Sequence, residues 1–521
     1  MPELVKEQVF LDHSAGSEEV QIMLEGDIIV PDTKPDMAQL LQTDERVTIE
    51  RTEASADRIN YVGLLNLTML YAAKDQGNTV HSIHLTRPLD DFINIEGATK
   101  DVWVRTKAEI VNIDYRTVND RKINYRAIIR IVATAEQSNA HDIIVHIHDV
   151  PENQLLKSTL NVNRTIDVRL DRFQVKDQIS LASSKPSMRE ILHTSVSIAN
   201  REARVANGRV QISGLLIVAT LYRGDAADSI LELVESEMPF NGPIDIAGAR
   251  DDMMANVALQ VLDCNASIRP DEDGEDRIID IEITIGAEAK VYCEESINTL
   301  EDAYSTTSAL TFEKTPISYP RLVCQNRNQA QIREAVSIPQ DSPGMLQNLR
   351  IKGLIHMDEV RVLEDKVIVE GAINTDLLYV AESDATPLAS FQTVIPYRQV
   401  IEAKGAQPGM QVSVDATIDS ATTNMQTPHE TEVKFQLTFS TQVVNIHHAS
   451  IISDVQSSEF SAEHLASQSS MTVYVVQPGD SLWKIAKKYN TSLDELVLVN
   501  ELENGSKLSI GQKLLLLKHG V

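Results

Sequence analysis

The 521-residue sequence has few cysteines, few aromatic residues and a deficit of positive charge. Its three cysteines, Cys264, Cys293 and Cys324, are widely spaced, which favours a reducing compartment and excludes a disulfide framework or a zinc-finger pattern. Aromatic residues make up only 4%, so a core of Val, Ile and Leu is expected, as in β-sheets. The net charge of −29 argues against nucleic-acid binding, which needs clustered Lys and Arg.

Long apolar runs are also missing. No stretch approaches the roughly 18 apolar residues that a membrane-spanning helix needs. The first seven residues have neither the basic nor the apolar region of a secretion signal. We therefore expect a cytoplasmic protein without a membrane span.

Motifs for catalysis and for metal binding are absent from the sequence as well. It contains no Gly-Lys-Ser/Thr phosphate loop and no Gly-x-Ser-x-Gly nucleophile elbow. The acidic segment 271–276 lacks the glycine position of an EF-hand loop. His146 and His148 share one face of an expected strand, but no further ligand pattern lies nearby. We expect no enzymatic activity, no catalytic residues, no metal site and no cofactor.

Five landmarks recur three times along the chain at identical spacings. In order, they are a Pro-x-Met element, a Gly, a Tyr, a second Pro and a Gly-Ala pair. The three sets are Pro35, Gly63, Tyr71, Pro88 and Gly97; Pro186, Gly214, Tyr222, Pro239 and Gly248; Pro343, Gly371, Tyr379, Pro396 and Gly405. The first glycines of the sets lie 151 and 157 residues apart, so each copy has the size of a domain rather than of a solenoid turn.

Inside each copy, apolar residues alternate with polar ones, which places them on one face of a β-strand. The pattern occurs at 123–129, 279–285 and 433–439, with partner segments at 255–261 and 412–418. Polar segments at 118–121 and 270–276 are typical of hairpin turns. We predict a mainly β fold with three tandem antiparallel β-domains. The Pro-x-Met element is expected to open either one helical turn or a strand.

The predicted boundaries place the first β-repeat at 1–160, the second at 161–310 and the third at 311–447. The segment 448–470 is rich in Ser and poor in apolar clusters, which predicts a flexible linker. Residues 471–521 form a separate small domain. Six Lys against five Asp and Glu give this domain a charge of about +1, so the preceding 470 residues carry about −30.

The order of elements predicted in this last segment is strand, helix, helix, strand. A β-prone run at 473–476 ends at a Pro-Gly turn. Leu482, Ile485, Ala486 and Tyr489 have the spacing of the apolar stripe on a helix. A Ser-x-x-Glu capping box at 492–495 begins the second helix, and 514–517 is the closing strand.

This order and these residues resemble the LysM family. The opening match is Tyr474-x-Val476-x-x-Gly479-Asp480-Ser481-Leu482, and the closing match is Leu508-x-Ile510-Gly511-Gln512-x-Leu514. The resemblance implies a shallow groove for peptidoglycan and other N-acetylglucosamine polymers, between the loop after the first strand and the loop before the second. The groove residues that it implies are Gly479, Asp480, Ser481, Leu482, Asn500, Leu502, Leu508, Ser509, Ile510 and Gly511.

Several of these residues also have a purely structural interpretation, since Gly479 and Gly511 can serve turns and Leu482 can serve the core. Trp483 lies one residue off the apolar stripe, so the periodicity leaves it at least partly exposed. An exposed Trp is typical of a contact residue, and we add it to the candidate site. The alternative is that it covers the first strand of its own domain.

Three acidic β-repeats followed by one LysM domain resemble the SipL-type spore-coat morphogenetic proteins of clostridia. The resemblance implies a non-enzymatic assembly scaffold in the mother-cell cytosol, at the forespore surface. It also implies that the LysM domain contacts a coat-basement ATPase-type morphogenetic protein. The alternative is a protein that binds peptidoglycan or N-acetylglucosamine oligomers.

Overall fold

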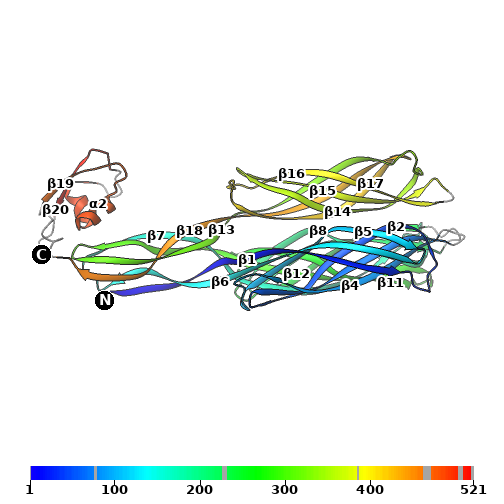
Figure 1. Cartoon of the computed structure of the whole chain (residues 1–521), viewed down its shortest axis with the longest axis horizontal. Coiled ribbons are helices and arrows are strands. Elements are labelled where there is room, and N and C mark those ends of the chain that lie inside the picture. The colour runs from blue at the N-terminus through cyan, green and yellow to red at the C-terminus, as the bar shows by residue number, and fades with distance from the viewer. Residues whose placement is uncertain are drawn as a thin grey trace.

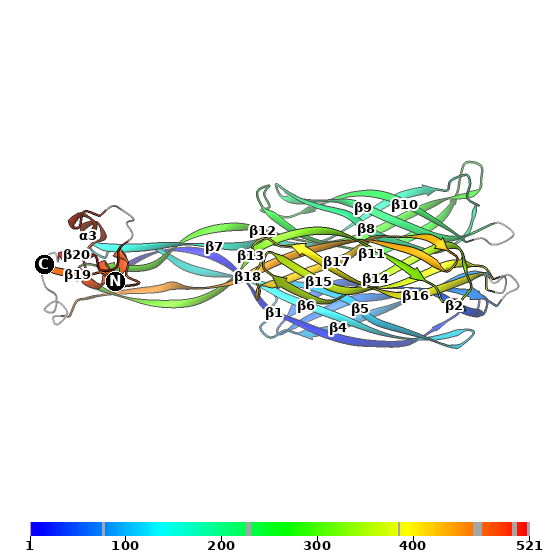
Figure 2. The same cartoon turned by 90° about the horizontal axis from the view of Figure 1, so that it is seen from above.

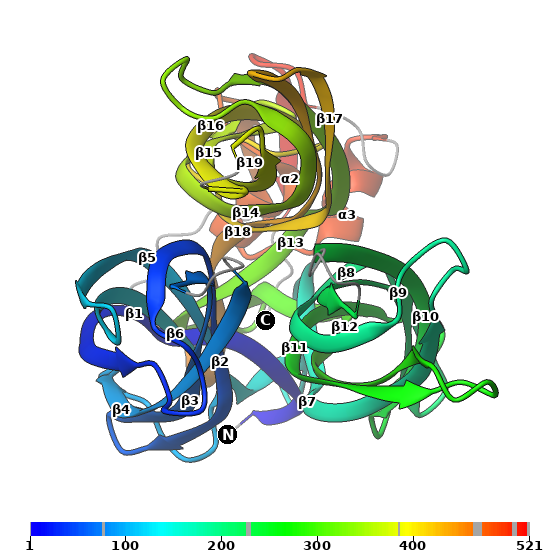
Figure 3. The same cartoon turned by 90° about the vertical axis from the view of Figure 1, so that its right-hand side faces the viewer.

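Three β-rich lobes, a long stalk and a small C-terminal module make up the molecule (Figure 1). The computed structural model describes residues 2–74, 79–225, 231–383, 386–461, 471–502 and 508–517. Viewed along the long axis, the three lobes surround a common centre (Figure 3). Each lobe belongs to one sequence repeat, so repetition along the chain becomes an approximate threefold symmetry in space.

Within the described residues, eighteen long strands, six for each repeat, build the lobes and the stalk. Repeat 1 contains β1 (Glu3–Ile29), β2 (Met37–Ser55), β3 (Arg58–Ala73), β4 (Val80–Asn94), β5 (Trp103–Asn119) and β6 (Lys122–His148). Repeat 2 contains β7 (Asn153–Ser180), β8 (Met188–Ala206), β9 (Arg209–Gly224), β10 (Leu231–Asp245), β11 (Met254–Pro270) and β12 (Asp276–Ser305). Repeat 3 contains β13 (Ser308–Ser337), β14 (Met345–Leu363), β15 (Lys366–Ala381), β16 (Leu388–Glu402), β17 (Gln411–Thr427) and β18 (Glu430–Glu459).

Each repeat folds into two three-stranded antiparallel sheets around its own core. In repeat 1 the strand orders are β1-β6-β5 and β2-β3-β4, and the other two repeats have the corresponding orders. The alternating apolar residues of β6, such as Ile123 and Ile129, are buried against Ile59 and Leu65 of the opposite sheet. The prediction of a mainly β, antiparallel fold is therefore confirmed. The expected hairpin turns at 118–121 and 270–276 link β5 to β6 and β11 to β12.

The recurring landmarks are contacts that hold each repeat together. In each repeat the hydroxyl of the landmark tyrosine donates to the carbonyl oxygen of the proline in the Pro-x-Met element. The pairs are Tyr71 with Pro35 at 3.0 Å, Tyr222 with Pro186 at 3.1 Å and Tyr379 with Pro343 at 3.1 Å. The glycine landmark lies at a close chain approach, because a Cβ on Gly371 would lie 2.1 Å from the carbonyl oxygen of His356 on the neighbouring strand. Met188 begins β8, so the Pro-x-Met element opens a strand rather than a helical turn. The landmarks therefore stabilise the fold.

Leucines from all three repeats meet on the approximate threefold axis. One buried cluster contains Leu41, Leu192, Leu349, Leu70, Leu221 and Leu378. Each set of three has the spacings of 151 and 157 residues that separate the glycine landmarks. Burial of one such side chain contributes about 1.5–3 kcal/mol, so this contact joins the lobes into one body.

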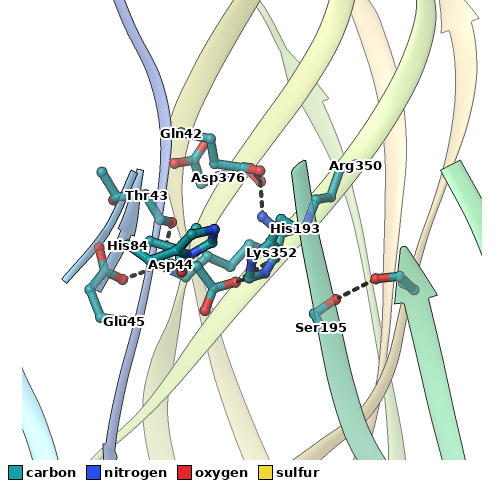
Figure 4. Close-up of polar contacts among 12 residues, drawn as sticks. Gln42, Thr43, Asp44, Glu45, His84, His193, Ser195, Arg350, Lys352 and Asp376 are labelled. Carbon is teal, nitrogen blue, oxygen red and sulfur yellow. Dashed lines mark hydrogen bonds and ion pairs between the residues drawn. The ribbon is translucent and has the colours of Figure 1, made fainter. Parts of the chain in front are cut away.

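A buried polar network beside these leucines differs from repeat to repeat (Figure 4). Asp44 of repeat 1 lies 3.1 Å from the Nε2 atom of His193 in repeat 2 and pairs with Arg350 of repeat 3. Arg350 also donates to Gln42 at 2.8 Å. Burial alone would raise the pKa of Asp44, but His193 and Arg350 hold it well below its usual range. Because equivalent positions carry Gln42, His193 and Arg350, the network fits only one arrangement of the repeats.

The stalk consists of the outer ends of the six longest strands (Figure 2). Its residues are 3–12 of β1, 139–148 of β6, 153–164 of β7, 294–305 of β12, 308–321 of β13 and 447–459 of β18. Ile143, Ile297 and Ile451, each 154 residues apart, are buried in its core. The links from β6 to β7 and from β12 to β13 lie at the tip of the stalk, so every repeat starts and ends there.

The predicted linker is wrong over 448–459. These residues continue β18 and pair with β13, from Ala449 opposite Ile317 to Glu459 opposite Ser308. Although the segment is rich in Ser, its few apolar residues, such as Ile452 and Val455, are buried in the stalk. Residues 462–470 of the predicted linker lie outside the described residues.

The predicted repeat boundaries also differ from the observed ones. The structure places the first boundary at 149–152 and the second at 306–307, whereas the sequence suggested 160/161 and 310/311. The predicted positions fall inside β7 and β13, because these strands run through the stalk before they reach their lobes.

Candidate functional site

The C-terminal module has the predicted strand, helix, helix and strand. These are β19 (Met471–Val475), α2 (Leu482–Tyr489), α3 (Leu493–Val499) and β20 (Lys513–Leu517), and the two strands pair antiparallel. Ser481 caps α2 by accepting from the amide of Lys484, and Ser492 caps α3 by accepting from the amide of Glu495. Neither helix is long and apolar enough to cross a lipid bilayer, nor is any other helix of the described residues.

The two loops of the candidate groove lie side by side at one end of the module. The amide of Val476 donates to the carbonyl oxygen of Gln512 and the amide of Gly511 donates back to Val476, both at 2.9 Å. Gly479 and Gly511 each have a φ of 85°, a left-handed conformation that favours glycine. The structure therefore brings the two predicted loops together, and both glycines are required by their turns.

Most polar side chains beside the loops form hydrogen bonds within the module. Asp480 accepts from the amide of Gln477 and from the hydroxyl of Tyr474, both at 2.8 Å, and these bonds lower the pKa of its carboxyl. The side chain of Asn500 donates to the carbonyl oxygens of Leu496 and Leu515 and accepts from the Leu515 amide. Asn500 therefore ties α3 to β20, a structural role that its place in the sequence pattern did not indicate.

The apolar members of the candidate site divide into two groups. Leu482, Leu502 and Leu508 are half-buried and pack against the core of the module. Ile510 is 72% exposed, between the exposed residues Ser509 and Gly511. An exposed aliphatic side chain on a loop can contact a sugar face or a flat protein surface. Ile510 is thus the most accessible apolar contact of the site.

Trp483 does not face the groove, because it contacts the stalk of its own chain. Its Nε1 donates to the Oδ2 atom of Asp302 at 2.9 Å, and its ring meets the ring of Tyr304 edge-on with centroids 5.0 Å apart. Lys487, one turn further along α2, donates to the other carboxylate oxygen of Asp302 at 2.5 Å. One stalk carboxylate therefore binds two side chains of the module.

Further contacts complete this docking site. The hydroxyl of Tyr304 donates to the carbonyl oxygen of Thr491 at 2.8 Å, and both residues are buried. The ammonium of Lys487 lies 5.3 Å from the ring centroid of Phe312, at the start of β13. The module is thus held by α2 and the turn after it, while the exposed parts of the two groove loops remain accessible.

Only the second repeat carries this docking site among the three ribbons of the stalk. The spacing of 154 residues that relates Ile143, Ile297 and Ile451 makes His148 and Gln456 the equivalents of Asp302. The same spacing makes Val150 and Ser458 the equivalents of Tyr304. Neither alternative pair offers a carboxylate beside an aromatic hydroxyl, so the module has one specific docking site on the stalk.

Sequence reasoning missed the stalk residues of this contact, Asp302, Tyr304 and Phe312. A comparison of the repeats could have singled out Asp302 and Tyr304, because they differ in type from their equivalents in the other two copies. The use of Trp483 by an external partner stays a prediction. Because Trp483 contacts the stalk, an external partner can bind it only after the module undocks.

A second cluster has the composition of a Ser, His and Asp set but not its geometry. Ser195 donates to the carbonyl oxygen of Ala219 at 3.4 Å, whereas His193 contacts Asp44. Burial, together with the charge of Arg350, lowers the pKa of His193, which keeps its ring neutral. We assign this cluster to the packing of the repeats.

The described residues contain no group of His, Cys, Asp or Glu arranged to hold a metal ion. The rings of His146 and His148 stack on each other with centroids 4.6 Å apart.

Comparisons with known proteins identify the domains of the chain. The SipL SPOCS domain family matches residues 36–118, 187–269 and 344–426, and the LysM domain family matches residues 474–516. No curated protein and no solved structure matches the chain significantly.

The three SPOCS matches coincide with β2–β5, β8–β11 and β14–β17, the lobe portion of each repeat. The LysM match covers the module from Tyr474 to Leu516. These domains make the chain a sporulation-related protein with a module of the peptidoglycan-binding type. With three tandem SPOCS domains followed by a C-terminal LysM domain, the chain belongs to the SipL-type proteins.

Proposed function

We propose that this protein is a non-enzymatic scaffold for assembly of the spore envelope, acting in the mother-cell cytosol at the forespore surface. Its LysM module would bind a coat-basement ATPase-type morphogenetic protein through the two groove loops and Ile510. The observation that carries the proposal is the docking of the module by α2, on the side of Asp302, with Ile510 left exposed.

The distribution of charge supports this arrangement. The body carries about −30 and the module about +1, so the body repels acidic surfaces while the module can approach them. Ion pairs between repeats, such as Lys107 with Asp415 at 2.9 Å, join the lobes into one unit. A joined body with one seated module can hold a bound partner at a fixed distance from the lobes.

The second candidate function is binding of peptidoglycan or N-acetylglucosamine oligomers. The paired loops at Val476 and Gly511 favour it, because the LysM groove is built from these elements. The exposed side chain of Ile510 can cover a sugar face as well as a flat protein surface. The two functions therefore compete for one site.

A capture experiment with the full-length protein distinguishes the two functions. The immobilised chain is incubated separately with purified coat-basement protein and with purified peptidoglycan. Replacement of Ile510 by Ser should weaken capture of the coat-basement protein about tenfold, the effect of losing roughly 1.4 kcal/mol of apolar burial. Val473→Ser is the matched control, since Val473 is 61% exposed on β19, away from the loops. Capture of peptidoglycan alone would refute the scaffold proposal in favour of the second function.

A further inference from the structure

The approximate symmetry relates side chains at the interfaces between neighbouring repeats. Arg172 of β7 pairs with Gly286 in the ladder, and Arg327 of β13 pairs with Ser440. Gly286 and Ser440 lie 154 residues apart, as do Ile297 and Ile451, so the two arginines are equivalent. On the facing strands, Glu50 and Arg201 are equivalent because they have the spacing of 151 residues that separates Leu41 and Leu192.

Charge at this position differs among the three interfaces. Between repeats 1 and 2, Arg172 donates to the carbonyl oxygen of Glu50 at 2.7 Å. Between repeats 2 and 3, the corresponding residues are Arg327 and Arg201, both basic. The third interface has Glu19 and Asp358 in these places. Only the interface of repeats 2 and 3 therefore sets two guanidinium groups at this position.

A cavity of about 670 Å³ opens where these two arginines meet. Its lining includes Asn200, Arg201, Glu202, Arg327, Gln329 and Asp419. A second cavity of about 290 Å³ shares both arginines and extends toward Arg105 of repeat 1. The β8 ladder is interrupted between Ala199 and Glu202, and Asn200 has a φ of 48°. This bulge removes Arg201 from the regular alternation of the strand, beside the cavity.

The two arginines have no carboxylate of their own among the described residues. Neither has an Asp or Glu oxygen within 4.0 Å, and the only hydrogen bond of their side chains runs from the Nε of Arg201 to the carbonyl oxygen of Ile198, at 3.1 Å. Burial lowers the pKa of the Arg201 guanidinium, which is half-buried, whereas the side chain of Arg327 is exposed. Two neighbouring guanidinium groups without a partner repel each other.

Nearby carboxylates are engaged elsewhere or lie at the edge of the cavity. Asp415 is paired with Lys107 of repeat 1 at 2.9 Å. Asp419 accepts from the hydroxyl of Thr438 at 2.5 Å, and burial raises the pKa of its carboxyl. Glu202 is exposed and forms no ion pair within the described part of the chain. The lining of the cavity therefore sets two carboxylates, Glu202 and Asp419, against two guanidinium groups, none of which is paired with another within 4.0 Å.

We propose that this cavity is a binding site for a small organic anion that carries a phosphate or carboxylate group. The guanidinium groups of Arg201 and Arg327 bind its oxyanion, and the amides of Asn200 and Gln329 supply further hydrogen bonds. The planar guanidinium fork matches both phosphate and carboxylate oxygens. The volume lies within the range of small-molecule sites, roughly 300–1,000 Å³. Because the site joins repeats 2 and 3, an occupant stabilises their contact.

Thermal unfolding of the full-length protein tests this site. Inorganic phosphate and citrate are titrated separately, with sodium chloride at matched ionic strength as the reference. The midpoint of unfolding should rise with at least one of the two anions beyond the chloride reference, and the more effective anion identifies the preferred group. Arg201→Gln and Arg327→Gln should abolish this rise. Arg172→Gln, the equivalent change at the other interface, should retain it.

A charge-reversal variant keeps the test decisive if loss of an arginine disturbs folding. Arg327→Glu places a carboxylate opposite Arg201, so it should raise the midpoint without added anion and remove the response to phosphate and citrate. A midpoint that neither anion raises above the chloride reference would overturn the proposal. So would a response that survives in both Arg201→Gln and Arg327→Gln. The result is independent of the groove of the LysM module.

Discussion

Replacement of Asp302 by Ala should release the LysM module from the stalk without unfolding it. Asp302 accepts from Trp483 and from Lys487 through its two carboxylate oxygens. The substitution leaves the apolar core of the module unchanged, including Ile485 and Leu496, and Tyr304 of the stalk is buried in the same cluster. The substitution therefore weakens the docking of the module on the stalk and leaves the fold of the module intact.

These contacts set the free energy of docking that the substitution removes. A hydrogen bond to a charged acceptor contributes about 1.5–3 kcal/mol when it is well buried. The side chains of Asp302 and Lys487 are 22% and 39% exposed, so solvent screening reduces their ion pair to below about 1 kcal/mol. The two contacts together contribute about 2–3 kcal/mol. Their loss should lower the ratio of docked to undocked molecules roughly 30- to 160-fold.

Tryptophan fluorescence reports on this release. The chain has two tryptophans, Trp103 and Trp483, so a Trp103→Phe background leaves Trp483 as the sole reporter. In Asp302→Ala the emission of Trp483 should shift to longer wavelength as its ring leaves Tyr304 and enters water. Glu301→Ala, a change at the exposed neighbour, is the control and should leave the emission unchanged. Identical spectra for Asp302→Ala and the parent would refute the docking site, provided that circular dichroism shows both to be folded.

Three further perturbations probe the body. Asp44→Ala leaves His193 and Arg350 buried without their carboxylate, so it should cost about 3–5 kcal/mol in urea denaturation, whereas the exposed Asp90→Ala should cost less than about 0.5 kcal/mol. Tyr222→Phe removes one hydrogen bond to a proline carbonyl and should lower the free energy of unfolding by about 1 kcal/mol; no loss would mean that water replaces the hydroxyl. The lowered pKa of His193 means that the folded state resists its protonation, so stability from this residue is complete above about pH 6.5 and is lost as the pH falls. The urea midpoint of His193→Gln should therefore fall less between neutral and mildly acidic pH than that of the wild type, and equal slopes would contradict this account.

The sequence predicted those features that depend on local spacing. The period of two in 433–439 marked a strand of repeat 3, and the apolar stripe of Leu482 and Ile485 marked α2, because each pattern lies within a few residues. The landmark prolines and tyrosines identified the repeats, and the structure shows why they recur, since they bond to each other in every copy.

The stalk and the docking site of the module could not be predicted from local spacing. The strand segment 448–459 forms by pairing with β13, more than a hundred residues earlier in the chain. Its own sequence has the composition of a linker. Trp483 was correctly placed off the buried stripe of α2, but its contact with Asp302 joins residues 181 positions apart. No pattern within the module indicates that partner, because the contact is created by tertiary structure alone.

The direction of β18 has a mechanical consequence. This strand runs from its lobe to the tip of the stalk, where the chain continues to the LysM module, and β13 lies antiparallel beside it along its whole length. If the module is anchored to a surface while the lobes are held elsewhere, tension passes along β18. The hydrogen bonds of the ladder then lie across the line of force and are loaded together in shear. Pulling the module back toward the lobes would instead peel the strand from Glu459, one residue pair after another. The protein should therefore resist separation from its anchor far better than it resists being folded back on itself.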